Sequence, residues 1–166
     1  MKLTDLWQSR SKPTLSFELF PARNEKAVAN LEKAIDKLAA LEPDFVSVTF
    51  GAGGSTRKGS RQLVKKLREE KGLETLAYFA GYGLSPDAIT AVINDYQALG
   101  VENILVVRGD EPRNEEFVPH PESFNYASDL MGFIRPRYEL CLGVAGYPEA
   151  HIDATSQAKD MEYLKR

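Results

Sequence analysis

The 166-residue chain contains little cysteine and histidine, and it has no long run of apolar residues. Its single cysteine, Cys141, excludes an internal disulfide. Its two histidines have no cysteine or histidine partner at the spacing of metal ligands, so we predict no metal site. The apolar run around Cys141 favours a strand residue over a reactive thiol, and scarce cysteine is typical of a reducing compartment.

A strong charge of one sign is also absent. The net charge is -3, and lysine and arginine are interleaved with glutamate and aspartate, so neither nucleic acid nor an anionic membrane is an expected partner. Residues 1–10 alternate charged and apolar side chains, without the continuous apolar stretch of a signal peptide or membrane span. We expect a short helix there, and a cytoplasmic protein.

Apolar and β-branched runs alternate with segments of helical periodicity, as in parallel strands joined by crossover helices. Asn24 can cap the first connecting helix, Ser85 with Pro86 can open a later one, and Thr155 or Ser156 can cap the last. No linker or repeat divides the chain, so residues 1–166 are expected to form a single domain. Strands are predicted within residues 14–20, 45–50, 74–82, 103–107 and 139–145.

This alternation fits two α/β architectures. A (β/α)8 barrel needs eight βα units and about 250 residues, whereas this chain supplies about five units. An open doubly wound sheet of this size could close its core without further residues. Composition and periodicity alone do not decide between the two.

The ends of the predicted strands carry the candidate functional residues. Glu18 lies between large apolar residues at the end of the first strand, and such surroundings disfavour the charged form, which suits a general acid at neutral pH. The structural alternative is a glutamate paired with an arginine or lysine. Arg108, Gly109 and Asp110 follow the fourth strand, where an arginine–aspartate pair bracing the loop is the alternative to a functional role.

A glycine-rich loop at residues 51–55 follows the second strand. Its glycines permit close approach of the backbone, so amide N–H groups could meet an anion or a flat ring. It is not a Walker loop, because no Gly-Lys-Ser/Thr sequence follows at the required spacing. A plain turn and the phosphate site of another barrel enzyme are the alternatives.

Five segments together resemble the methylenetetrahydrofolate reductase family. They are SFELFP (16–21), DFVSVTFGAGGST (44–56), RGD (108–110), YASD (126–129) and GVAGYPE (143–149). Each is weak alone, but their order and spacing across nearly the whole chain are specific. The resemblance favours a (β/α)8 TIM barrel, of which this incomplete barrel would cover about the first five βα units.

The resemblance implies that bound FAD is reduced by NADH or NADPH and that 5,10-methylenetetrahydrofolate is then reduced to 5-methyltetrahydrofolate. Glu18 matches the general acid, which protonates the folate so that its methylene bridge opens to an electrophilic iminium. Asp110 matches an aspartate near both the flavin and the pterin. Cofactor-binding positions are implied at Thr49, Phe50, Ala52, Tyr78, Arg108, Gly109, Asp110, Ala127, Tyr147, His151, Ala154, Asp160 and Arg166.

Two positions differ from the family's common pattern. Phe50 stands where tyrosine is usual, and Tyr78 stands where a histidine is common. A tyrosine can donate a hydrogen bond and stack, but it is not a cation at neutral pH. Flavin affinity or redox tuning is therefore expected to differ.

The chain ends at Arg166, before the later strands of such a barrel. It could be part of a longer enzyme, be completed by another chain, or be a non-catalytic flavin-binding or assembly subunit that pairs its open edge with a copy of itself. A homo-oligomer is expected, because an open barrel exposes strand edges and apolar faces.

Overall fold

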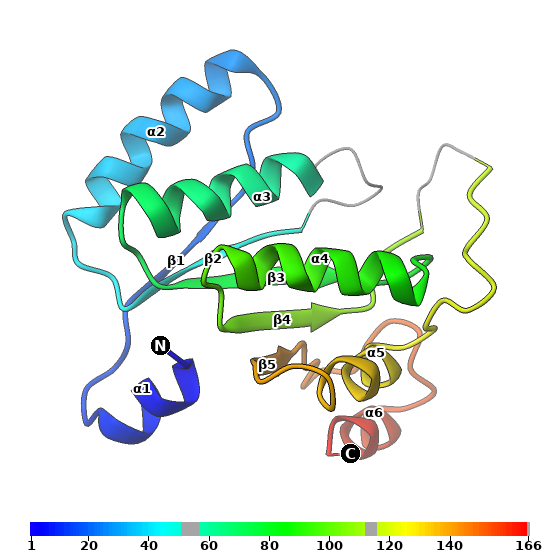
Figure 1. Ribbon diagram of the computed structural model, residues 1–166. Coiled ribbons are helices and arrows are strands. Elements are labelled where there is room, and N and C mark those ends of the chain that lie inside the picture. The colour runs from blue at the N-terminus through cyan, green and yellow to red at the C-terminus, as the bar shows by residue number, and fades with distance from the viewer. Residues whose placement is uncertain (51–56, 112–115, 166) are drawn as a thin grey trace.

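Five parallel strands joined by helices form the framework of the computed structural model, which describes residues 1–50, 57–111 and 116–165 (Figure 1). All neighbouring strands are parallel, and their order in the sheet is their order in the chain. A doubly wound sheet instead reverses its strand order at a switch point. The unbroken order confirms the predicted run of barrel βα units and excludes the doubly wound alternative. The strands are β1 (Ser16–Leu19), β2 (Phe45–Val48), β3 (Thr75–Ala80), β4 (Asn103–Val107) and β5 (Cys141–Val144).

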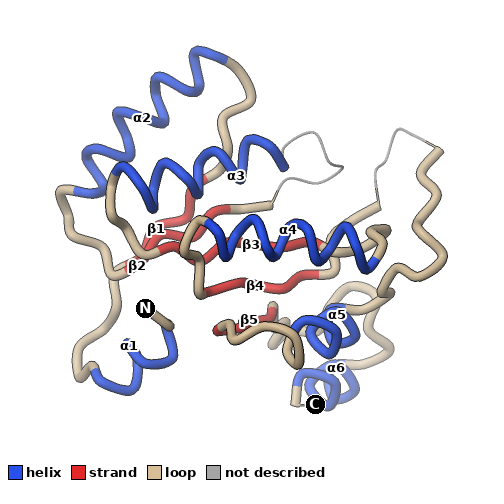
Figure 2. Tube along the Cα trace, in the orientation of Figure 1, coloured by secondary structure: helices blue, strands red, loops and turns tan. Residues whose placement is uncertain are grey.

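Helices precede β1 and follow each strand (Figure 2). The side chains of Asn24, Ser85 and Ser156 accept hydrogen bonds from backbone N–H groups in the first turns of α2, α4 and α6, so the three predicted caps are confirmed. The helices are α1 (Leu3–Ser9), α2 (Glu25–Ala39), α3 (Arg57–Lys65), the π-helical turn η1 (Lys66–Glu70), α4 (Pro86–Ala98), α5 (Ala127–Ile134) and α6 (Gln157–Leu164).

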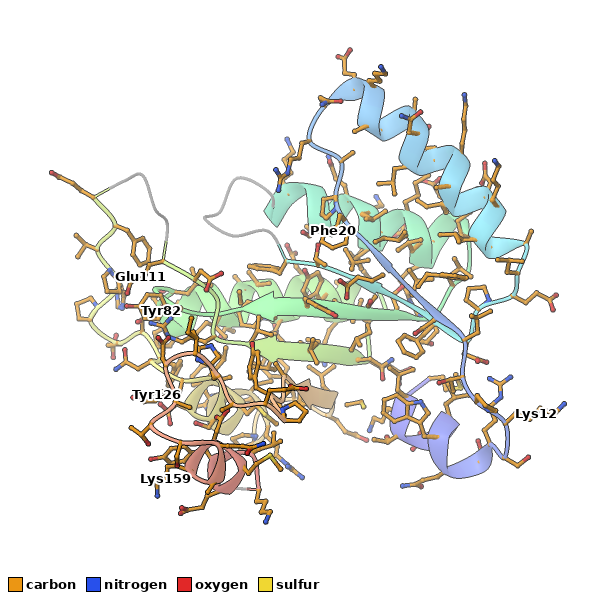
Figure 3. All side chains as sticks on the ribbon, turned by 180° about the vertical axis from the view of Figure 1, so that it is seen from behind. Lys12, Phe20, Tyr82, Glu111, Tyr126 and Lys159 are labelled. Atoms are coloured by element: carbon orange, nitrogen blue, oxygen red, sulfur yellow. The ribbon has the colours of Figure 1, made fainter. Side chains whose placement is uncertain are left out.

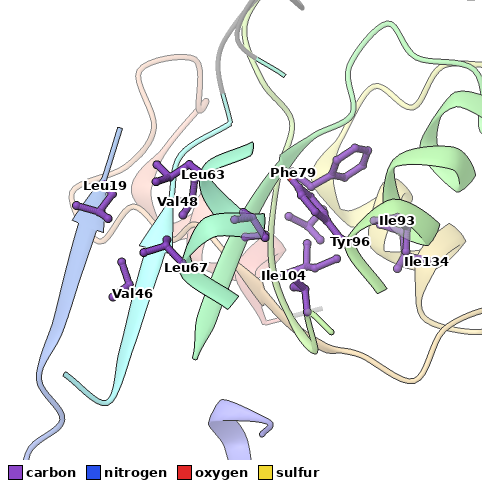
Figure 4. Packing of buried hydrophobic residues seen from close by; sticks show 14 of the residues in the cluster. Leu19, Val46, Val48, Leu63, Leu67, Phe79, Ile93, Tyr96, Ile104 and Ile134 are labelled. Atoms are coloured by element: carbon purple, nitrogen blue, oxygen red, sulfur yellow. The ribbon is translucent and has the colours of Figure 1, made fainter. Parts of the chain in front are cut away.

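One face of the sheet is covered by helices and holds the core. Because successive strand residues point to opposite faces, Val46, Val48 and Phe79 fall on this covered face, where they are buried. Leu63 and Leu67 pack over the first two strands, and Tyr96, Ile93 and Ile134 gather around Phe79 (Figure 4). This apolar layer fixes the strands relative to one another.

The opposite face of the sheet is the one that a closed barrel turns inward. It carries Glu18, Ser47, Tyr78, Leu105 and Gly143, which strand register places on the same side. Of these, only Ser47 is buried, whereas Tyr78, Leu105 and Gly143 are half-buried and Glu18 is exposed. The polar candidates for chemistry therefore lie on the open face.

The amino-terminal end of the sheet is closed by α1, at the opposite end from the loops that follow the strands (Figure 1). Leu3 is buried, and its N–H donates to Oδ1 of the buried Asn103, 2.8 Å away. The short helix predicted for residues 1–10 is thus confirmed. Across the described residues, no helix combines the length and apolar character needed to cross a membrane.

Candidate active site

Three side chains from three neighbouring strands meet at the carboxylate of Glu18. Ser47 in β2 is the register partner of Glu18 in β1, and its Oγ donates to Glu18 Oε2 over 3.3 Å. Tyr78 lies in β3, two residues beyond the register partner of Ser47, so it points to the same face. Its hydroxyl donates to the same Oε2. The sheet thus places two hydroxyl donors on one carboxylate oxygen.

The surroundings of Glu18 differ from those expected from its neighbours in sequence. Phe17 and Leu19 were expected to give an apolar environment, but strand alternation turns them to the opposite face, and Leu19 is buried there. Glu18 is exposed and contacts hydroxyl groups instead. No ion pair joins it to an arginine or lysine in the part of the chain that the structure describes, so the structural alternative is not seen there.

The phenol of Tyr78 is held in its protonated form. Partial burial, then the hydrogen bond to Glu18 and the negative charge of that carboxylate, raise the pKa of Tyr78 above its ordinary value, while a weaker contact with Ser47 acts in the opposite direction. Tyr78 therefore remains a hydrogen-bond donor at neutral pH.

A second group of side chains lies beyond the end of β4. The Arg108 guanidinium stacks 4.0 Å from the centre of the Tyr82 ring, and its Nε donates to the carbonyl of Asn125 over 3.0 Å. Tyr82 in turn donates to Glu111 Oε1 over 2.7 Å (Figure 3). The ion-pair partner of Arg108 is Glu111, 3.9 Å away. The alternative of an Arg108–Asp110 pair is not seen among the described residues, and Asp110 is exposed.

Gly109, between Arg108 and Asp110, has a backbone that excludes a side chain. Its φ is +88°, and a Cβ there would lie 2.9 Å from the Cβ of Ala80. Only glycine meets both conditions without strain. The backbone of the β4 loop can therefore pass close to the end of β3.

A third group of side chains lies between β5 and α6, where four of the predicted cofactor positions come together. The His151 N–H donates to Asp160 Oδ2 over 2.8 Å, and the Tyr147 ring meets the His151 ring edge-on with 4.8 Å between centroids. The Ala154 N–H donates to the carbonyl of His151 over 2.9 Å. These contacts tie the loop that carries Tyr147, His151 and Ala154 to Asp160 in the first turn of α6.

The remaining predicted positions are more scattered. The Thr49 N–H donates to the carbonyl of Leu19, the Phe50 ring packs edge-on against Phe79 of the core at 5.5 Å, and Ala127 begins α5. Ala52 and Arg166 lie outside the described residues, as does the glycine-rich loop at residues 51–55. Within the described ranges, no three His, Cys, Asp or Glu residues are grouped to hold a metal ion.

Sequence reasoning missed Ser47, Tyr82 and Glu111. Ser47 had a usable signal, because it is the only polar residue in the apolar run of β2 and pairs with Glu18 once the two strands are aligned. No sequence signal pointed to Tyr82 or Glu111, because their contact depends on how two separate loops meet.

The comparisons with known proteins agree with this arrangement. The family model described as methylenetetrahydrofolate reductase matches residues 2–166. The chain belongs to the methylenetetrahydrofolate reductase family. The 5,10-methylenetetrahydrofolate reductase of Escherichia coli (strain K12) is 35% identical over 152 residues, which are 92% of this chain and 50% of the relative.

Eukaryotic members of the methylenetetrahydrofolate reductase family match as well. Methylenetetrahydrofolate reductase 1 of Schizosaccharomyces pombe is 33% identical over 94% of this chain and 26% of its own length. Methylenetetrahydrofolate reductase (NADH) 1 of Zea mays is 33% identical over 93% of this chain and 28% of its own length. The chain thus spans about half the length of the E. coli relative and about a quarter of these two.

Among solved structures, the 4-hydroxy-tetrahydrodipicolinate synthase of Methylacidiphilum fumariolicum SolV is similar, with a TM-score of 0.56 and 16% identity. The match covers 83% of this chain and 45% of that one. At this identity the likeness concerns the fold alone.

Proposed function

We propose that the protein carrying this chain reduces 5,10-methylenetetrahydrofolate to 5-methyltetrahydrofolate, with NADH or NADPH as co-substrate and FAD as cofactor. The observation that carries the proposal is the family match over residues 2–166. Because this chain spans about half the length of the E. coli relative, the activity is proposed for the whole protein. We also propose that it works in the cytoplasm, as a homo-oligomer.

The open face of the sheet offers a fitting surface for a flat ring. Tyr78, Leu105 and Gly143 are register partners across β3, β4 and β5, and all three are half-buried. Gly143 adds no side chain, and a Cβ there would lie 3.1 Å from Leu105 Cδ1. This row is therefore partly apolar, as the lining of a cofactor site is.

The loops beyond the strands would hold the rest of the cofactor. Gly109 brings backbone close to the open face, and Arg108 and His151 supply groups that can bind phosphate. FAD, when bound, would supply the hydride chemistry, and the protein would supply orientation and protons. The proposed cofactor contacts are those of Thr49, Phe50, Ala52, Tyr78, Arg108, Gly109, Asp110, Ala127, Tyr147, His151, Ala154, Asp160 and Arg166.

Glu18 is the proposed general acid. It lies next to the carboxyl end of β1 on the open face, where a bound substrate could reach it, and its exposure leaves it accessible to a proton from solvent. Its task is to give a proton to the folate, without which the methylene carbon is a poor hydride acceptor. Asp110, exposed in the β4 loop, is the proposed second carboxylate at the pterin.

The two half-reactions separate these roles. Glu18→Gln keeps the shape of the side chain but removes the acid. We expect NAD(P)H to reduce the flavin of this variant at the wild-type rate, while folate reduction falls by about 10²–10⁴-fold, the usual contribution of a general acid. Stopped-flow absorbance of the flavin measures both steps.

Two outcomes would go against the proposal. Equal loss in both half-reactions would remove Glu18 from the role of proton donor. Purified protein that is colourless and takes up no flavin from an excess would contradict the enzymatic function itself. Flavin uptake with no folate reduction would favour the alternative of a non-catalytic flavin-binding or assembly subunit.

A further inference from the structure

The two carboxylate oxygens of Glu18 have unequal surroundings. Oε2 accepts from both Ser47 and Tyr78, while no hydrogen bond reaches Oε1 from the residues that the structure describes. A carboxylate oxygen has two lone-pair positions, so two donors fill the capacity of Oε2. While both hydroxyls donate to Oε2, a proton on Glu18 is carried by Oε1.

We propose that Tyr78 and Ser47 are positioning residues for the acid, occupying Oε2 of Glu18 so that its transferable proton is carried by Oε1. This inference rests on the proposed function, because the acceptor of that proton is the folate. In this proposal Tyr78 positions the acid through its hydroxyl, which donates a hydrogen bond to Glu18.

The sheet makes this arrangement stiff. Glu18, Ser47 and Tyr78 come from three adjacent strands whose register is fixed by backbone pairing, and Ser47 is only 7% exposed. Both donors are neutral hydroxyls, and the raised pKa of Tyr78 keeps its proton in place. The proton of the acid therefore has one defined location without a charged partner that would compete with the substrate.

Removing either hydroxyl tests the consequence for the reaction. In the intact protein, we expect Tyr78→Phe and Ser47→Ala each to slow folate reduction by about tenfold to a hundredfold, the loss typical of a misplaced reacting group. In Ser47→Ala, reduction of the flavin and the dissociation constant of the folate should change by less than about twofold, because Ser47 is not one of the proposed cofactor contacts. A variant that only disturbed the structure would slow flavin reduction and folate reduction together.

Tyr138→Phe is the matched control. It also removes a tyrosine hydroxyl that donates a hydrogen bond, to Asn94 Oδ1 over 3.1 Å, outside the candidate active site. It should leave both half-reactions unchanged. Wild-type rates of folate reduction in Tyr78→Phe and Ser47→Ala, or equal losses in both half-reactions of Ser47→Ala, would overturn the inference.

A second measurement needs neither flavin nor folate. The pKa of Tyr78 can be read from the 13C signal of its Cζ, assigned by its disappearance in Tyr78→Phe. In Glu18→Gln we expect this pKa to fall toward its ordinary value but to stay above it, because the carboxylate is removed and the burial remains. An identical pKa in the two proteins would show that Tyr78 does not hold Glu18, and would overturn the inference.

The titration keeps the two proposals distinguishable. If the intact wild-type protein does not reduce the folate, the proposed function fails, and the titration still decides whether Tyr78 holds Glu18. If folate is reduced and the titration shows no coupling, the inference fails alone.

Discussion

Among the individual residues, Tyr96 links stability to pH. Its side chain is 3% exposed, and burial, followed by the charge of Asp95, raises its pKa far above the ordinary value. In the unfolded chain a tyrosine ionises near pH 10. The contribution of Tyr96 to the free energy of unfolding is therefore fully present below about pH 10. It is lost as the pH rises toward the pKa of Tyr96 in the folded protein, at up to about 1.4 kcal/mol per pH unit.

We expect Tyr96→Phe to lose less stability than the wild type at alkaline pH. Urea unfolding followed by circular dichroism, at pH 7 and at about pH 11, measures the difference. At pH 7 the phenol is protonated in both states, so the difference there reports only packing and serves as the control. Parallel losses in the two proteins above about pH 10 would contradict the role of Tyr96.

Residue types alone made Glu18 a candidate without deciding its role. It was singled out because it lies between large apolar residues at a strand end, and the structure adds the two hydroxyl groups that contact it. Ser47 could have been found by aligning two strands. The partner of Arg108 could not, because the nearer carboxylate in sequence is Asp110, yet the structure pairs it with Glu111.

Among the secondary-structure elements, the end of α3 differs most from what the sequence predicts. The spacing of Leu63, Val64 and Leu67 predicts a single helix that ends at Gly72, but the chain widens into the π-helical turn η1. The Lys71 N–H reaches the carbonyl of Lys66, and the Leu73 N–H reaches that of Leu67. Apolar periodicity places Leu67 in the core in either case, so it does not reveal the wider turn.

Gly72 ends this helix, and its replacement isolates the cost of the turn. Its φ is +64° and no neighbouring atom would lie within 4 Å of an added Cβ, so Gly72→Ala changes only backbone energy. We expect the free energy of unfolding to fall by about 1–2 kcal/mol, the cost of a left-handed residue that is not glycine. Thermal and urea unfolding measure the change.

Gly132→Ala is the matched control for Gly72→Ala. Gly132 lies inside α5, and it too has no atom within 4 Å of an added Cβ, but its φ is not positive. Alanine should there raise the free energy of unfolding by up to about 1 kcal/mol, through helix propensity. Equal effects of the two substitutions would mean that the left-handed turn at Gly72 does not determine the cost.

For the molecule as a whole, the order of strands was predictable and the character of the open face was not. Alternating apolar runs predict βα units, and the sheet follows them in sequence order. The choice of a barrel over a doubly wound sheet came from the resemblance, because periodicity is the same in both. Apart from Ser47, the residues of the open face are only partly buried, because among the described residues no further strand pairs with β1 or β5 to close the sheet over them, and no local sequence pattern encodes this.

Both edges of this sheet are unpaired among the described residues, since β1 pairs only with β2 and β5 only with β4. Apolar side chains lie exposed beside them: Phe20 follows β1 with 66% of its surface exposed, and Val144 in β5 is 40% exposed. Unpaired edges with exposed apolar residues promote association. We expect the 166-residue chain on its own to associate as its concentration rises.

Val144→Lys tests this expectation at one edge, because lysine on an edge strand opposes pairing. Sedimentation velocity over about a tenfold range of concentration should show less association than for the wild type. Val118→Lys adds the same charge at a loop residue that is 83% exposed and lies in no strand, so it should associate as the wild type does. A wild-type chain that stays monomeric throughout, or two variants that weaken association equally, would contradict association through the β5 edge.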